Sequence, residues 1–191
     1  MSALPETESL DRLINQRLEA LLPKKLAELR EQQTPSMTII ATKGTLDWAY
    51  PPFILATTAA AMGLEVTMFF TFYGLTLLKK NLNLKISTLG NPAMEMPMMG
   101  MHMGMPNLVS AIPGVDAAAT AMMKNLIKKK GVASIEELRE AAVESDINLV
   151  ACQMTMDLFE YKVEDMIPGI TVGGAATYME KALKSDINLF I

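Results

Sequence analysis

The residue with the clearest chemical potential in this sequence is its one cysteine, Cys152. It follows the apolar run Ile147 to Ala151, which has the length and composition of a buried strand. Met154, Leu158 and Tyr161 follow at helical spacing, so we predict that Cys152 lies where a strand gives way to a helix. In open α/β sheets, ligands bind beyond the carboxyl ends of the strands. The free N–H groups at a helix start would also favour a thiolate there.

Spacing alone leaves two interpretations of Cys152 open. One is a buried structural cysteine, a common fate of a free thiol. The other is a reactive thiolate. Because the sequence has no second cysteine, an intrachain disulfide and a dithiol cycle within one chain are excluded, and any redox cycle must be completed by another protein. Only His102, the sole histidine, could serve Cys152 as a histidine base.

Residues 88–107 form a methionine-rich segment whose prolines and glycines argue against a regular helix, and we expect it to be irregular. Seven of the 17 methionines lie here, together with His102: Met94, Met96, Met98, Met99, Met101, Met103 and Met105. Thioether sulfur is a soft ligand that suits Cu(I). Methionine also packs irregular surfaces well, so a flexible apolar lid is the alternative.

Two glycine-containing loops follow predicted strands. Thr42-Lys43-Gly44-Thr45 lacks the spacing of a Walker A loop, and Gly173-Gly174 lacks the full dinucleotide fingerprint. Both suit ordinary turns or loop walls. Because both follow strands, the alternative is that both line the same cleft as Cys152.

Apolar runs and helical periodicities alternate along the chain. The predicted strands cover residues 37–41, 64–70, 84–87, 147–151, 170–172 and 187–191. Helical segments are predicted at residues 48–62, 72–80, 108–130, 134–144 and 173–184, besides the one that follows Cys152. Alternating strands and helices with short links predict an α/β fold with a doubly wound, mostly parallel sheet. The sequence Ser-Asp-Ile-Asn-Leu occurs at 145–149 and again at 185–189, which indicates one helix-to-strand junction used twice.

Residues 1–33 carry an apolar stripe characteristic of an amphipathic helix: Leu10, Ile14, Leu18, Leu21, Leu22, Leu26 and Leu29. Pro23 should bend this helix or split it in two. We expect the stripe to pack on the rest of the chain or on a second copy rather than on a membrane surface. The predicted organisation is an extension and linker over residues 1–36 and one α/β domain over 37–191.

The stretch from Phe53 to Leu78 contains one charged residue, Glu65, and a hydropathy window would treat it as a membrane span. We favour a different interpretation, because Gly63-Leu64-Glu65 reads as a helix-to-strand turn. Parallel strands buried on both faces are also continuous apolar runs. Membrane association is the alternative.

The composition argues against nucleic-acid binding and against a zinc site. The 191 residues carry a net charge of −4, which gives no general attraction to nucleic acid. One cysteine and one histidine exclude a Cys-rich zinc site and argue against a histidine-based one. A lone thiol and a polar, acidic N-terminus without a signal-peptide apolar region suit a cytoplasmic protein. We expect no cofactor.

Several separated motifs, in order, resemble the DsrE/DsrF/DsrH-like family. The main ones are residues 151–158, Ala-Cys-Gln-Met-Thr-Met-Asp-Leu, and residues 173–178, Gly-Gly-Ala-Ala-Thr-Tyr. Residues 42–47, 91–94 and 131–138 also fit, within a long DsrE-like subgroup often labelled peroxiredoxin-related. The resemblance covers about residues 37 to 191. The methionine-rich segment departs from it.

The resemblance implies a parallel, Rossmann-like three-layer α/β sheet of about five strands, usually assembled into homo- or hetero-oligomers. It also implies a sulfurtransferase or sulfur carrier that relays sulfane sulfur with rhodanese-type or TusA-like partners, with Cys152 as the persulfide-bearing residue. Nothing in the residues supports peroxide chemistry. The expected pocket residues are Thr42, Lys43, Gly44, His102, Met154, Thr155, Gly173 and Gly174. The alternatives are a Cu(I)- or nucleotide-binding module, or a structural subunit assembled through its N-terminal helix, each with an inert Cys152.

Overall fold

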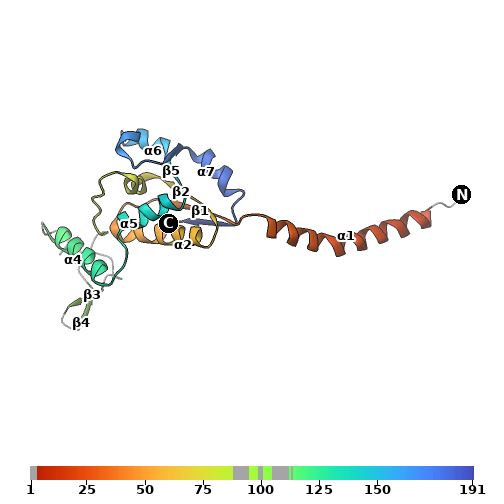
Figure 1. The fold of residues 1–191 in the computed structure, drawn as a ribbon, viewed down its shortest axis with the longest axis horizontal. Helices are drawn as coiled ribbons and strands as arrows, with labels where there is room; N and C mark the ends of the chain where they lie inside the picture. The colour runs from red at the N-terminus through yellow and green to blue at the C-terminus, as the bar shows by residue number, and fades with distance from the viewer. Residues whose placement is uncertain (1–3, 88–94, 99–100, 105–111, 113) are drawn as a thin grey trace. The chain divides into compact units, whose positions relative to one another are not determined.

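The computed structural model describes the backbone at residues 4–87, 95–98, 101–104, 112 and 114–191, and the side chains at 10–29, 33–87, 112 and 114–191. The chain divides into two compact units, residues 1–34 and 35–191 (Figure 1).

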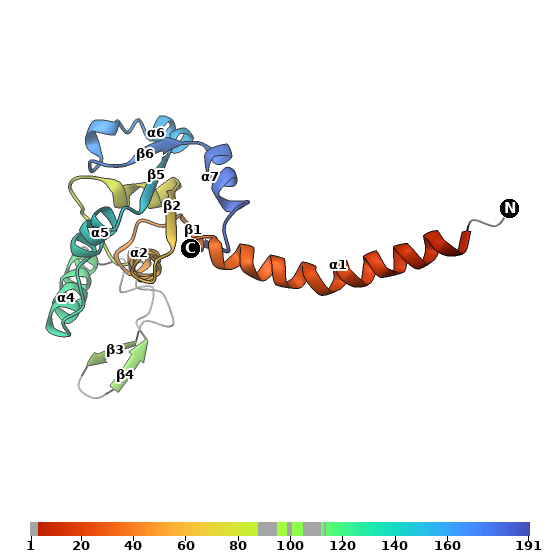
Figure 2. The same cartoon turned by 45° about the vertical axis from the view of Figure 1, so that its right-hand side comes forward.

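The first unit is a single long helix, α1 (Leu4–Gln32), of 29 residues with Pro23 inside it. Figures 1 and 2 show one continuous, curved ribbon. Of the two outcomes that Pro23 allowed, the structure has the bent helix and not the split one. A proline inside a helix removes one backbone hydrogen bond without necessarily ending the helix, which accounts for a bend.

The second unit is built on a five-stranded parallel sheet. Its strands are β1 (Ser36–Ala41), β2 (Glu65–Phe70), β5 (Asn148–Cys152), β6 (Thr171–Gly173) and β7 (Ile187–Phe190), in the order β6-β5-β2-β1-β7. This confirms the predicted α/β fold with a parallel sheet. Because all strands run the same way, the residues that follow β1, β2 and β5 gather at one edge of the sheet.

Helices lie on both sides of the sheet (Figures 1 and 2). On one side, α2 (Leu46–Ala61) and α5 (Ile135–Glu144) cover a large core that includes Phe53, Phe70 and Met68, each fully buried. On the other side α7 (Ala175–Ala182) lies over a small buried cluster of Phe69, Val150 and Cys152, with Tyr178 packed against it. The short helix α6 (Gln153–Leu158) continues directly from β5 and buries Met156 in the large core. The remaining elements are α4 (Val115–Lys129) and the 3-10 helices η1 (Phe72–Leu78) and η2 (Val163–Asp165).

The strand predicted at residues 84–87 is wrong. These residues have no regular secondary structure and belong to neither of the two described sheets. Their backbone groups bond elsewhere: the Lys85 carbonyl accepts from Leu46 N–H, and Ile86 N–H donates to the Thr120 hydroxyl at 3.2 Å. Ser87 N–H donates to the Asp47 carboxylate at 2.8 Å. The segment therefore forms hydrogen bonds with the start of α2 and with α4, and it does not add a strand to the sheet.

Two other predicted segments differ in detail. The helix predicted at 72–80 is a 3-10 helix that ends at Leu78, and the helix predicted at 108–130 is described from Val115 onward. In η1, Gly74 lies so close to β1 that a Cβ there would stand 2.2 Å from the Ala41 carbonyl oxygen. Contact with the sheet, and not helix propensity, fixes the path of η1.

Part of the methionine-rich segment has regular structure. Strands β3 (Glu95–Met98) and β4 (Met101–Gly104) form an antiparallel pair in which Met96 is opposite Met103 and Pro97 opposite His102. The prediction of an irregular segment is wrong for these eight positions. Proline and glycine exclude a helix but are tolerated in a short two-stranded ribbon.

The repeated Ser-Asp-Ile-Asn-Leu junction has a structural counterpart. Its two asparagines, Asn148 and Asn188, pair in register with threonines of the central strands. Asn148 Nδ2 donates to Thr67 Oγ1 at 3.4 Å, and Thr38 Oγ1 donates to Asn188 Oδ1. The repeated sequence therefore supplies the same kind of cross-strand hydrogen bond twice. One joins β5 to β2, and the other joins β7 to β1.

The apolar stretch from Phe53 to Leu78 is divided among α2, β2 and η1. Within the described residues, no helix is long and apolar enough to cross a bilayer.

Candidate functional site

The structure places Cys152 at the end of β5, with α6 beginning at the next residue. This is the strand-to-helix junction that the spacing predicts. Cys152 is 4% exposed and forms a buried cluster with Phe69 and Val150 of the sheet. Ile40 of β1 and Tyr178 of α7 pack against this cluster. The thiol therefore lies in the thinner of the two layers that flank the sheet.

Two threonine hydroxyls lie next to this thiol. Thr71 follows β2, and Thr155 is in the first turn of α6 and 1% exposed. Their oxygens are 3.1 Å apart, and Phe72 N–H donates to Thr155 Oγ1 at 3.1 Å. Because the amide of Phe72 occupies an acceptor position on Thr155, the Thr155 proton is left to be donated onward.

These groups change the acidity of Cys152. Burial alone raises the pKa of the thiol, because it disfavours the thiolate. Hydrogen bonds from the Thr155 hydroxyl and N–H, from the Thr71 hydroxyl and from Met154 N–H outweigh burial, so the pKa lies below its ordinary value. The cause is a set of individual donors, since α6 has only six residues and its dipole is correspondingly small.

The backbone at Phe72 is unusual. Its φ of 48° lies in the left-handed region, where a bulky residue is rare. Such a conformation costs about 1–3 kcal/mol and persists where its surroundings impose it. Here the bond from Phe72 N–H to Thr155 Oγ1 holds it, so the strained residue positions the hydroxyl beside Cys152.

Two glycines at the end of β6 lie beside Cys152: Gly173 is the last residue of the strand and Gly174 follows it. Gly173 is the register partner of Cys152, and Gly174 precedes α7 as its N-cap. A Cβ at Gly173 would stand 3.0 Å from the Thr177 side chain, so glycine at this position lets α7 approach the sheet closely. Tyr178 of α7 then packs on Phe69, with ring centroids 5.5 Å apart, and covers the cluster.

The loop after β1 has its contacts elsewhere. Thr42 bonds the Ile191 carbonyl through both N–H and hydroxyl, at 2.8 and 3.0 Å. The Lys43 ammonium lies 3.1 Å from the centre of the Trp48 ring. A Cβ at Gly44 would meet the Thr76 hydroxyl oxygen at 2.2 Å, so Gly44 packs on η1. The loop thus supports η1, whose first residues adjoin Cys152, and is not grouped with the thiol itself.

We predict from the sequence that Met154 lines the pocket, but in the structure Met154 is 65% exposed. Leu158 on the same helix is 61% exposed. The buried residues of α6 are Thr155 and Met156. The apolar stripe predicted from the spacing of Met154 and Leu158 therefore faces solvent. The reason is that α6 ends after six residues and turns its other face to the sheet.

The side chains of His102 and of the methionines from Met94 to Met105 lie outside the described residues, so their predicted roles stay predictions. Over the part of the chain that the structure describes, no group of three or more His, Cys, Asp or Glu side chains could hold a metal ion.

A row of aromatic residues lies between η1 and the segment that follows α6. Tyr73 stacks on Phe159 with ring centroids 5.9 Å apart, and Phe159 contacts Tyr161 at 5.7 Å. Lys79 Nζ lies 3.5 Å from the centre of the Tyr161 ring. This row joins η1 to the segment after α6, so it links the two elements that flank the threonine pair.

Comparison with known proteins is consistent with this geometry. The profile of the DsrE/DsrF/DrsH-like family matches residues 33–190. The chain is 58% identical over 155 residues to the sulfur carrier protein DsrE2 of Allochromatium vinosum, covering 81% of this chain and 97% of that one. It is 34% identical over 163 residues to the uncharacterized protein YrkE of Bacillus subtilis (strain 168), covering 84% and 99%.

Among solved structures, the ychN protein from E. coli is similar, with a TM-score of 0.47 and 12% identity over 83% of this chain and 100% of that one. The family profile spans most of the chain, and two relatives exceed 30% identity over nearly their whole length. The chain belongs to the DsrE-like family.

Proposed function

We propose that this protein is a sulfur carrier that holds sulfane sulfur as a persulfide on Cys152. The observation that carries the proposal is a single buried thiol whose pKa is lowered by the Thr71 and Thr155 hydroxyls and by two backbone N–H groups. The 58% identical relative named a sulfur carrier supports the same chemistry.

Loading needs no oxidant. The Cys152 thiolate attacks the outer sulfur of a donor persulfide, R–S–SH. The S–S bond of the donor breaks and a new S–S bond forms at Cys152, giving Cys152–S–SH, and the donor leaves as the thiolate R–S⁻. Unloading is the same exchange with an acceptor thiolate. Because the sequence contains one cysteine, donor and acceptor are other molecules, of which rhodanese-type and TusA-like proteins are the expected classes.

The surrounding groups suit each step. A lowered pKa gives more thiolate near neutral pH, which is the form that attacks. The hydroxyls of Thr71 and Thr155 can donate to sulfur in the thiolate and then in the persulfide anion. Ile40, Phe69 and Tyr178 exclude water from the inner sulfur, which protects it from oxidation.

Intact-mass spectrometry tests the proposal. The full-length protein is incubated with polysulfide, or with thiosulfate and a rhodanese, and we expect a reducible mass increase of about 32 Da, one sulfur atom. Cys152→Ser should abolish the increase. Thr120→Val is a matched control, because Thr120 is also a buried threonine that accepts a backbone N–H, and it lies away from the thiol.

Two outcomes would contradict the proposal. One is a mass increase that persists in Cys152→Ser. The other is no adduct under conditions that convert a small thiol to its persulfide. In the second case, tight Cu(I) binding by Cys152→Ser would favour a metal-binding module built on the methionine-rich segment.

A further inference from the structure

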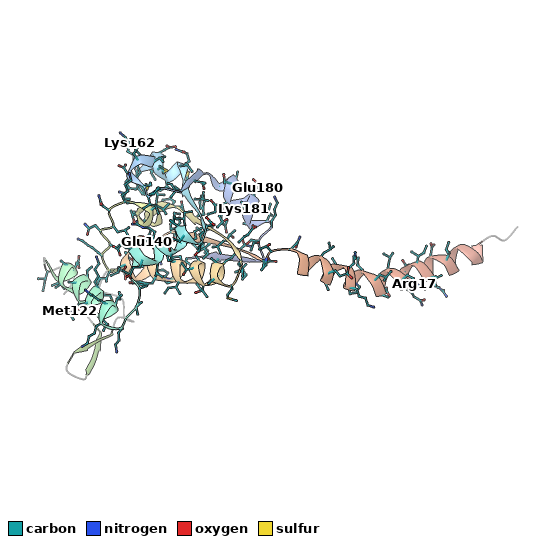
Figure 3. The ribbon with its side chains drawn as sticks, in the orientation of Figure 1. Arg17, Met122, Glu140, Lys162, Glu180 and Lys181 are labelled. Atoms are coloured by element: carbon teal, nitrogen blue, oxygen red, sulfur yellow. The ribbon has the colours of Figure 1, made fainter. Side chains whose placement is uncertain are left out.

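The helix α7 turns one narrow face to the sheet. Of its eight residues, only Tyr178 and Ala182 are not exposed, and these two are about one helical turn apart. Figure 3 labels Glu180 and Lys181 among the exposed side chains of this helix. The side of α7 that meets the rest of the α/β unit is therefore defined by Tyr178 and Ala182.

This face lies across the strand end that carries Cys152. In the sheet, β5 stands between β6 and β2, and α7 packs on both of these neighbours. Thr177 packs closely on Gly173 of β6, which is the register partner of Cys152. The ring of Tyr178 packs on Phe69 of β2. Because α7 contacts the strands on either side of β5, its first turn spans the end of β5, where the thiol lies.

A chain of polar groups holds α7 in this position. Asn188 Nδ2 donates to the carbonyls of Ala182 and Ser185 at 3.3 and 3.5 Å. That orientation leaves Asn188 Oδ1 to accept from Thr38 Oγ1. Because the Thr38 proton is used there, the Tyr178 hydroxyl is the donor in its 3.4 Å contact with Thr38 Oγ1. The chain runs from Tyr178 through Thr38 and Asn188 to the Ala182 carbonyl, and we call it the α7 latch.

Thr38 is the buried member of the latch. It is 2% exposed, and buried hydroxyls are almost always hydrogen-bonded, because water does not replace a lost partner there. When α7 lifts from the sheet, Thr38 loses the Tyr178 hydroxyl and Asn188 loses the Ala182 carbonyl. Opening thus breaks two hydrogen bonds at once, which favours the closed position.

The latch uses one of the two copies of Ser-Asp-Ile-Asn-Leu. Asn188 of the second copy reaches α7, whereas Asn148 of the first copy bonds Thr67 of β2 and Thr171 of β6. The two asparagines have the same place in the repeat and the same kind of cross-strand bond, but they differ in their contact with α7. The chain therefore offers a matched control for the latch.

We propose that Tyr178, Thr38 and Asn188 determine which encounters at Cys152 are productive: the latch keeps α7 over the end of β5, and molecules in solution reach the thiol only when it opens. Small thiols and oxidants are thereby kept from the sulfur for as long as α7 is closed. The proposal concerns access to the thiol and holds whether or not Cys152 carries sulfur.

Tyr178→Phe in the full-length protein tests the latch. Phenylalanine keeps the ring on Phe69 and removes the hydroxyl. We expect the limiting rate of Cys152 alkylation by iodoacetamide, measured at high pH, to rise about threefold, since one long hydrogen bond is lost. The midpoint of the pH profile should stay unchanged, because Tyr178 is not among the groups that lower the pKa of Cys152. A faster rate at an unchanged midpoint identifies access and not acidity.

The two asparagines provide the matched pair. Asn188→Ala removes the other end of the latch and should also raise the alkylation rate severalfold. Asn148→Ala removes the same side chain from the first copy of the repeat and should leave the rate within about twofold. In the double variant Tyr178→Phe, Asn188→Ala, the increase should be smaller than the product of the single increases, because both changes break one chain.

Three results would overturn the proposal. An alkylation rate in Tyr178→Phe equal to that of the unmodified protein would show that the latch does not control access. A shifted midpoint would show that Tyr178 acts on the acidity of the thiol. Equal acceleration by Asn148→Ala and Asn188→Ala would trace the effect to general loss of stability. If the asparagine variants do not fold, Tyr178→Phe alone decides, since it keeps the packing of the ring.

Discussion

At the scale of single residues, the acidity of Cys152 is decided by two opposed effects. The thiol is nearly fully buried, which favours its neutral form. Hydrogen bonding from the Thr155 hydroxyl and N–H, the Thr71 hydroxyl and Met154 N–H favours the anion, and together these groups outweigh burial, so the pKa is lowered. Thr155 has the larger share of this effect, because both its hydroxyl and its N–H take part.

Thr155→Val should therefore raise the pKa of Cys152. Valine removes the hydroxyl, keeps the shape, and leaves Phe72 N–H without its partner, at a cost of about 1–3 kcal/mol. The rate of alkylation by iodoacetamide against pH should show its midpoint at higher pH than in the unmodified protein. Thr120→Val should cost similar stability and leave the midpoint unchanged. An unchanged midpoint in Thr155→Val would show that its hydroxyl does not act on the sulfur.

The same shift makes stability depend on pH with a defined sign. The pKa of Cys152 is lowered on folding, so the folded state binds the proton more weakly than the unfolded state. The stabilisation is thus fully present above the unfolded pKa and is lost as pH falls through the folded pKa. In Thr155→Val this pH-dependent part of the unfolding free energy, measured by urea unfolding across that pH range, should shrink.

At the scale of elements, η1 is the support of the site. It begins at the strained Phe72, beside Thr155, and packs through Gly74 against the carbonyl at the end of β1. Its far end is held by Arg139 of α5, whose Nη1 donates to the carbonyls of residues 77 and 79 at 3.2 and 2.6 Å. The position of Thr71 thus depends on contacts with both β1 and α5.

Gly74→Ala should displace η1 and disturb the thiol without touching it. The new Cβ would stand 2.2 Å from a carbonyl oxygen, an overlap that costs about 1–3 kcal/mol or more. We expect lower stability in urea unfolding and slower alkylation of Cys152. Gly63→Ala is the control: its φ of 86° adds strain, but its Cβ meets nothing within 4 Å. Equal losses of reactivity in both variants would mean that lost stability, and not the position of η1, slows the reaction.

At the scale of the whole molecule, the large core of the α/β unit draws its buried members from residues 37–166, with partly buried partners up to Ile191. Folding of that unit rests on the layers that flank its sheet.

Removal of residues 1–34 should accordingly leave the unfolding free energy of the α/β unit within about 1 kcal/mol of its value in the full chain. The Cys152 alkylation rate should also be unchanged. Urea unfolding followed by tryptophan fluorescence reports on this unit, since Trp48 is the only tryptophan. A large loss of stability would show that α1 packs on the α/β unit.

Local patterns predict much of this architecture. The parallel sheet, the capping box of Ser134 and Glu137, and the strand-to-helix junction at Cys152 depend on residues close together in sequence. Thr71 was not predicted, because it is 84 residues from Thr155 and only the pairing of β2 with β5 unites them. Residues 84–87 have the composition of a strand, but tertiary hydrogen bonds occupy their backbone. Strand propensity is a local property, and it does not determine which hydrogen-bond partners the fold brings to a segment's backbone.

The thin cover on the Cys152 side of the sheet has a kinetic consequence. No residue of α7 is fully buried, and Tyr178 is the residue through which it joins the cluster around the thiol. A segment held by so few contacts opens locally at small free-energy cost, far below that of global unfolding. If Cys152 carries sulfur as we propose, the lifetime of that sulfur atom would depend on how often α7 lifts from the sheet. Amide hydrogen exchange along α7 measures how often this opening occurs.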